Sequence, residues 1–285
     1  MRFALLALSA LVACADAPAS GPEVAAGAPE AARDTVRADW AGAFAEHGVT
    51  GTFVLQHIAS GRTQRYDAAR AAERFRPAST FKVYNALVAL ETGAVGDPDS
   101  AFVWDGVERM APAWNRDQSL AEALPASAVW VFQDIAEAVG RERYDAAFAR
   151  EPFGNGTVGD DLRLFWLDGS LRVSADEQVA FLRRLRLGEA GFRPEVQAAV
   201  RAMVPVLVER GDVRLGGKTG WGLRDGRPDL GWLVGWLEHP DGPFVYALNV
   251  EAAGPEVEVD LRTARLGVVR AILEGDGLLP RGGAE

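Results

Sequence analysis

A serine and a lysine three residues apart, in the stretch PASTFKVYNAL, could together perform nucleophilic chemistry. Ser79 and Lys82 would share one face of a helix, because side chains at this spacing lie about 5–6 Å apart at Cβ. Pro77, just before them, suits the first turn of a helix. A serine hydroxyl becomes a nucleophile when a base removes its proton, and a lysine amine of lowered pKa can be that base. The same S-x-x-K spacing also occurs as a solvated pair on helix surfaces, so spacing alone does not decide its role.

The scarcity of lysine favours the chemical interpretation. Of the 30 lysine and arginine residues, only Lys82 and Lys218 are lysines. An arginine stays protonated and cannot act as a base, whereas an amine can. Lys218 lies in GKTGWG on an expected strand, where Gly220 lets a ligand approach the backbone closely. The two lysines thus occupy the S-x-x-K and K-T-G positions of one serine–lysine catalytic pattern.

Two other chemistries have little support. The sequence has no G-x-S-x-G motif, which argues against a serine–histidine esterase. Its histidines, His47, His57 and His239, offer no pair at metal-ligand spacing, so we expect structural roles for them and no metal site.

Four short motifs follow one another along the chain: STFK (79–82), SAV (127–129), FGN (153–155) and KTG (218–220). In this order they resemble the serine penicillin-recognising proteins, and among them the class D (oxacillinase-type) β-lactamases, from about Thr52 to Pro280. Class A enzymes have S-D-N as the middle motif and a glutamate base, and class C enzymes have Tyr-x-Asn; this sequence has neither. Phe153 stands where many class D members have tyrosine, a departure that bears on fine substrate preference.

The resemblance implies a role for each motif residue. Ser79 would be the acylated nucleophile, and Lys82 the general base for acylation and deacylation. In the family this lysine is carbamylated, so carbon dioxide or bicarbonate is the expected source of an N6-carboxyl group on Lys82, with no bound cofactor. An apolar pocket favours the neutral amine that attacks carbon dioxide. The residues that match this pocket are Val129, Phe132, Trp166 and Leu167, with the Trp166 indole N–H expected to hydrogen-bond the carbamate.

The remaining motif residues would handle the substrate. Ser127 resembles the proton shuttle toward the leaving nitrogen, with Lys218 supplying positive charge beside it. Thr219 and Arg265 would bind the substrate carboxylate, with Arg262 as the alternative arginine. Backbone N–H groups of Ser79 and Trp221 would form the oxyanion hole, next to Gly220. Phe153 and Asn155 would order the loop behind Lys82.

The elements that must position these residues follow from hydrophobic periodicity. The segment 34–48 predicts a helix with Asp34 as N-cap, and GTFVLQHI and GRTQRYD predict a hairpin. A second strand set, VRLGGKTGWG, DLGWLVGWLE and FVYALNVE, precedes a last helix over about Asp260–Glu274. The middle, about 79–205, is mainly helical. We expect an α/β (α+β) fold of the β-lactamase/transpeptidase type: an antiparallel sheet lobe built from both chain ends plus an inserted all-helical lobe, with the site between them.

The N-terminus indicates export. Arg2 followed by FALLALSALVA predicts a signal peptide over 1–13, and LVAC resembles a bacterial lipobox that would lipidate Cys14. Cleavage at an ordinary small-x-small site is the alternative. Residues 14–33, rich in Ala, Pro and Gly, predict a flexible tether, and 34–285 the catalytic domain. We therefore expect the protein on the periplasmic side, at the membrane only through a lipid on Cys14.

The net charge of −10 argues against a nucleic-acid partner. The resemblance implies a small β-lactam substrate. A monomer and a homodimer are both compatible with the sequence. Two alternatives to a hydrolase stay open: a β-lactam sensor that remains acylated, and a D,D-peptidase-like protein. The apolar frame expected around Lys82 favours turnover. Substrate range would depend on the loops near Trp104–Trp114 and Leu223–Leu230.

Overall fold

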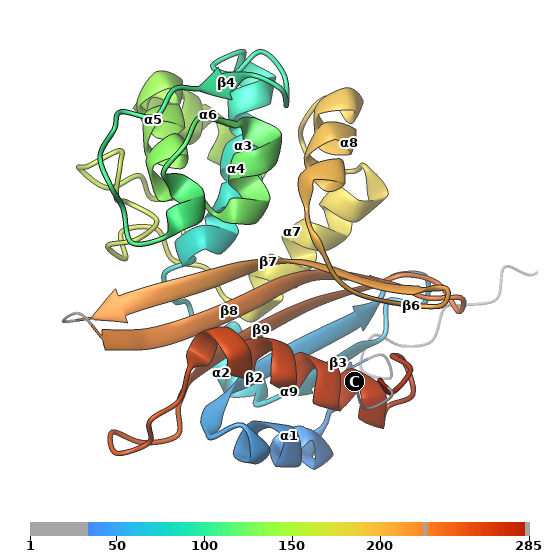
Figure 1. Cartoon of the computed structure of the whole chain (residues 1–285). Coiled ribbons are helices and arrows are strands. Elements are labelled where there is room, and N and C mark those ends of the chain that lie inside the picture. The colour runs from blue at the N-terminus through green and yellow to red at the C-terminus, as the bar shows by residue number, and fades with distance from the viewer. Residues whose placement is uncertain (1–33, 225–226, 283–285) are drawn as a thin grey trace, which may run out of the picture.

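A seven-stranded sheet crosses the middle of the computed structural model, which describes residues 34–224 and 227–282 (Figure 1). Its strands lie in the order β1-β3-β2-β9-β8-β7-β6, and all neighbours are antiparallel except β1 and β3. The strands are β1 (Asp34–Val36), β2 (Val49–His57), β3 (Thr63–Tyr66), β6 (Val206–Arg210), β7 (Val213–Arg224), β8 (Arg227–Glu238) and β9 (Phe244–Ala252). The N-terminal and C-terminal strands meet where β2 pairs with β9, so the sheet is built from both chain ends as predicted.

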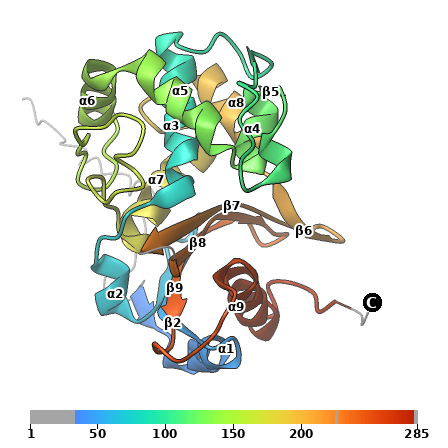
Figure 2. The same ribbon diagram turned by 60° about the vertical axis from the view of Figure 1, so that its left-hand side comes forward.

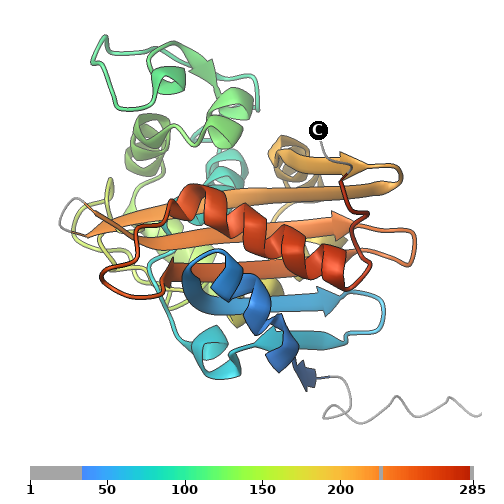
Figure 3. The same ribbon diagram turned by 60° about the horizontal axis from the view of Figure 1, so that its bottom comes forward.

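Helices cover both faces of this sheet (Figures 1 and 3). One face carries α1 (Ala41–Glu46) and α9 (Leu261–Gly275), which enclose a core with β2, β8 and β9. The buried residues of α9 recur every three or four positions, which gives that helix one apolar face. The opposite face carries α7 (Ala175–Leu187), which packs on β2, β8 and β9.

The helical lobe stands on the α7 side of the sheet, and Figure 2 shows it above β7. Its elements are α3 (Phe81–Thr92), α4 (Leu120–Ala126), α5 (Val129–Val139), α6 (Arg141–Arg150) and α8 (Pro194–Met203). The short helix α2 (Ala68–Ala72) packs instead against β2, β3 and α7. Residues Phe81–Leu90 of α3 are all buried, so this helix runs through the core of the lobe. The N-terminus of α3 faces the sheet, which brings the STFK motif to the boundary between the lobes.

The structure corrects one predicted boundary. Asp34 does not cap a helix: residues Asp34–Val36 form β1, which pairs in parallel with β3, and the helix begins at Ala41. Main-chain pairing at the open edge of β3 outweighs the weak helical pattern of this segment. The structure also adds elements that the pattern does not predict: the edge strand β6, and a small sheet of β4 (Ala101–Phe102) and β5 (Gln118–Ser119) in the helical lobe.

The predicted signal peptide (1–13), Cys14 and the tether (14–33) lie outside the described residues. Within the described ranges, no helix combines the length and the hydropathy needed to cross a bilayer.

Candidate active site

Ser79 lies in a tight turn where the chain enters α3. The turn is a 3₁₀ helix of Ala78–Thr80, in which side chains three residues apart eclipse one another. Ala78 has a φ of 48°, a left-handed conformation that is costly for a residue with a Cβ and is often found at functional sites. Two hydrogen bonds hold the turn: Ala78 N donates to the Trp166 carbonyl (3.1 Å), and Thr80 Oγ1 donates to the Pro77 carbonyl (2.8 Å).

Lys82 is fully buried below this serine. Its Nζ donates to Ser79 Oγ at 2.9 Å, to the Ser127 carbonyl at 2.7 Å and to Ser127 Oγ at 3.1 Å. Burial holds the pKa of the amine well below its usual value, and the nearby positive charge of Lys218 lowers this pKa further. The lowered pKa makes the side chain easier to deprotonate, a property that a base requires and a guanidinium lacks.

Ser127 joins the two lysines. It lies in the turn between α4 and α5 with a φ of 58°, and its Oγ accepts a hydrogen bond of 2.9 Å from Lys218 Nζ. Lys218 enters from β7 and is also buried; burial, and then the charge of Arg265, lower its pKa to about 7. The hydroxyl of Ser127 thus lies within hydrogen-bond reach of both amines, which provides a path for a proton between them.

An apolar frame encloses the Lys82 amine. The Phe132 ring centroid lies 5.5 Å from Nζ, and Trp166 packs against Phe81 of α3. Trp166 is fully buried, yet its indole Nε1 has no hydrogen-bond partner among the described side chains and main chain. An unsatisfied buried donor is costly, so this N–H has room for an acceptor that the described residues do not supply. Val129 and Leu167 are partly buried and line the cleft on the same side.

The lobes enclose a cleft of about 730 Å³ that reaches Ser79 and Ser127. Thr219, Gly220 and Trp221 of β7 form one wall. A Cβ on Gly220 would lie 3.0 Å from the Pro77 carbonyl oxygen, so glycine allows β7 to approach the serine turn. This close approach brings the backbone of the two predicted oxyanion-hole residues, Ser79 and Trp221, to the same part of the cleft.

Arg265 supplies a buried cation to the cleft. Its Nη1 donates to the Gly220 carbonyl at 2.7 Å, while its Nε is buried without a partner among the described residues. Burial lowers its pKa to about 10, so the guanidinium still keeps its charge at neutral pH. The alternative arginine, Arg262, is exposed and bonds Asp260 at its own helix start. The geometry therefore favours Arg265 over Arg262 as the group for a substrate carboxylate.

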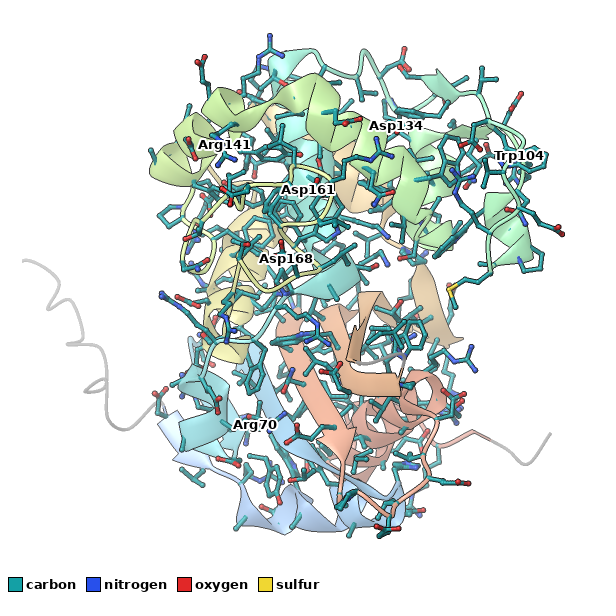
Figure 4. All side chains as sticks on the ribbon, turned by 90° about the vertical axis from the view of Figure 1, so that its left-hand side faces the viewer. Arg70, Trp104, Asp134, Arg141, Asp161 and Asp168 are labelled. Atoms are coloured by element: carbon teal, nitrogen blue, oxygen red, sulfur yellow. The ribbon has the colours of Figure 1, made fainter. Side chains whose placement is uncertain are left out.

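The FGN motif lies in the long loop between α6 and α7 behind α3, where Figure 4 labels Asp161 and Asp168. Phe153 is buried against Phe81 of α3, with ring centroids 5.8 Å apart. Asn155 is exposed, but its side chain bonds both Ser170 O (2.9 Å) and Arg172 N (2.9 Å). It thereby joins the two ends of the loop that carries Trp166, which is the contact that the predicted loop-ordering role requires.

Several residues that line the cleft are absent from the predicted set. Trp130, Met110 and Arg76 are among them. Trp130 directly follows the SAV motif, and Met110 lies in the 104–114 loop predicted to affect substrate range. Arg76 precedes Pro77 and STFK, but only the folded chain shows what its side chain contacts.

The fold and this serine–lysine site define a penicillin-recognising serine domain, and the family model described as "Penicillin binding protein transpeptidase domain" matches residues 51–274. The beta-lactamase OXA-20 of Pseudomonas aeruginosa is 36% identical over 244 residues, covering 85% of this chain and 88% of that protein. OXA-3 from the same organism is 37% identical over 248 residues, covering 86% of each. A class D β-lactamase structure, YbXI from Nostoc, superposes with a TM-score of 0.78 at 32% identity, covering 84% of this chain and 99% of that one. The chain belongs to the class D β-lactamases.

Proposed function

We propose that the protein hydrolyses the β-lactam ring of penicillin-type antibiotics through an acyl-enzyme on Ser79. The observation that carries this proposal is the buried Lys82 amine, hydrogen-bonded to Ser79 Oγ at 2.9 Å and to Ser127 Oγ at 3.1 Å. The relatives that match most of the chain are named beta-lactamases.

The residues of the cleft define the acylation step. Arg265 and Thr219 hold the substrate carboxylate, and the Ser79 and Trp221 N–H groups polarise the lactam carbonyl. The Lys82 side chain takes the proton of Ser79 Oγ, whose lone pair forms the new C–O bond. The C–N bond of the ring then breaks, and the nitrogen takes a proton from Ser127. Lys82 passes to Ser127 the proton that it took from Ser79, while the positive charge of Lys218 assists this transfer. A water molecule later cleaves the ester and returns the proton to Ser79.

The site also fits carbon dioxide on Lys82. The fit rests on a buried amine of lowered pKa, an apolar frame and an indole N–H of Trp166 that has no partner among the described residues. A carbamate there would supply an anionic oxygen base in place of the amine. We propose that this modified Lys82 is the resting form of the enzyme.

Multiple turnovers are the expected result when the purified protein meets benzylpenicillin or a chromogenic cephalosporin. The released product should exceed the enzyme by many equivalents, and added bicarbonate should raise the rate. A burst of one equivalent without a steady state would contradict hydrolysis, and would favour a sensor or D,D-peptidase-like protein that acylates without efficient turnover.

We also propose that Cys14 is lipidated and anchors the protein on the periplasmic side, because LVAC matches a lipobox. Cells given labelled palmitate should label the native chain and not Cys14→Ser. Equal labelling of both forms would contradict the anchor.

A further inference from the structure

An ion pair beside the cleft joins Arg76, in the segment before Ser79, to the far end of the β7–β8 hairpin. Arg76 lies three residues before Ser79, and its guanidinium pairs with Asp229 near the start of β8. The same Nη2 donates to the Leu223 carbonyl 3.2 Å away. Both side chains are largely buried, with exposed fractions of 14% for Arg76 and 21% for Asp229. A pair at this depth is held more rigidly than one on the surface.

The contact falls on an irregularity of the hairpin. The register between β7 and β8 shifts between Gly222 and Leu223, one residue beyond Trp221. A Cβ on Gly222 would lie 2.4 Å from Arg76 Nη2, so the guanidinium occupies the space that any side chain there would need. Bulges beside active sites change the direction of a strand, and here Arg76 contacts the strand where that change occurs.

A second set of contacts fixes the main chain of the same segment. Trp232 Nε1 of β8 donates to the Arg76 carbonyl at 3.0 Å. A Cβ on Gly220 would lie 3.0 Å from the Pro77 carbonyl oxygen, so glycine allows this close approach. The serine turn is thus tied to the middle of the hairpin through its backbone, and to the hairpin's end through the Arg76 side chain. The wall of Trp221–Leu223 lies between these two ties.

We propose that Arg76 is a positioning residue for the reaction: it holds the Trp221–Leu223 wall at a fixed distance from Ser79. The position of this wall determines the direction in which the Trp221 N–H points and the space in the cleft for the substrate's side chain. Arg76 does not bind the substrate carboxylate, because Asp229 compensates its charge. The inference rests on the proposed β-lactamase function.

Four variants test the ion pair: Arg76→Ala, Arg76→Lys, Asp229→Ala and the double alanine variant. The matched control is Arg74→Ala, because Arg74 lies in the same segment and pairs with Glu177 but is absent from the cleft lining. For each protein, kcat and KM are measured with benzylpenicillin and with a cephalosporin of bulky side chain. The acylation rate with a fluorescent penicillin and the Tm are measured in parallel.

Arg76→Ala should lower kcat/KM for benzylpenicillin about tenfold, mostly in kcat, because small displacements of catalytic groups are costly. The acylation rate should fall by a similar factor. The kcat/KM for the bulky cephalosporin should fall less, because the Trp221–Leu223 wall is no longer held by Arg76 and leaves more room for the substrate's side chain. Arg76→Lys should recover part of the loss, since an ammonium can pair with Asp229 but lacks the guanidinium fork. The double variant should lose less than the sum of the two single losses, because partners in one contact are not additive.

Two results would overturn the proposal. One is unchanged kinetics in Arg76→Ala when the native protein is acylated and turns over normally. The other is a loss that is equal for both substrates and is reproduced by Arg74→Ala, which would mark a general structural effect. If the native protein is not acylated by the fluorescent penicillin and releases no hydrolysed product, the proposed function itself is contradicted, and with it the role of Arg76.

Discussion

Lys82→Ala is expected to lower benzylpenicillin turnover by at least about a thousandfold, because general-base catalysis typically contributes 10²–10⁴ and this side chain serves both half-reactions. The residual protein should accumulate as acyl-enzyme, since water has no base to activate it. The measurement is steady-state kcat together with intact-mass detection of the Ser79 adduct. Turnover within tenfold of the native rate would contradict the assignment of Lys82 as base.

Substituting arginine for each lysine in turn tests whether that position requires a positive charge or a group that can lose its proton. Lys82→Arg should be as inactive as Lys82→Ala, since a guanidinium keeps its proton. Lys218→Arg should retain much more acylation, because the proposed role of Lys218 is to supply positive charge beside Ser127, whose Oγ accepts from its Nζ at 2.9 Å. If both arginine variants lose activity equally, the two lysines do not differ in the way proposed.

The sequence predicts that Ser79 and Lys82 lie side by side because the two residues are close in the chain. The spacing of Ser79 and Lys82 places both on one turn whether that turn is 3₁₀ or α-helical, so the detailed geometry of the turn does not affect the prediction. Lys218 could be paired with them only through the resemblance, because β7 reaches the site by sheet pairing between distant parts of the chain.

The long central strands and the amphipathic α9 are also predictable, since each carries a clear hydrophobic pattern over many residues. Asp34–Val36 is not predictable, because three exposed residues join an edge by main-chain pairing, which leaves no pattern of side chains. The left-handed φ of Ala78 and Ser127 is likewise hidden, as neither residue type favours it.

The contact of Arg76 with Asp229 joins positions 153 residues apart, and no local rule relates them. Arg262 and Arg265 both line the cleft, and they differ in exposure and in hydrogen-bond partners. The sequence can state that an arginine near the start of this helix is suitable, but burial and the bond to the Gly220 carbonyl decide which one. Chemistry that depends on residue type and spacing is therefore predictable, whereas positioning by distant side chains requires the fold.

Trp166→Phe is expected to make activity dependent on added bicarbonate. Phenylalanine keeps a ring against Phe81 but removes the indole N–H, which has no other partner in the described residues. A hydrogen bond to a charged group contributes about 1.5–3 kcal/mol, so the affinity of Lys82 for carbon dioxide should fall roughly ten- to a hundredfold. Carbon-13 NMR with labelled bicarbonate should show a weaker carbamate signal, and excess bicarbonate should restore both signal and rate.

The pH dependence gives the same variant a second readout. Burial lowers the pKa of Lys82, so its amine is neutral above that lowered value and protonated below it. Because only the neutral amine takes up carbon dioxide, carbamate and activity should disappear as the pH falls. In Trp166→Phe this acid limb should move to higher pH. Protonation of the Lys82 amine competes with uptake of carbon dioxide, so a carbamate that is held more weakly is lost at a higher pH. Trp40→Phe, which alters a buried indole in the other core, should leave the acid limb and the bicarbonate response unchanged. An unshifted acid limb and an undiminished carbamate signal in Trp166→Phe would refute the role assigned to the indole N–H.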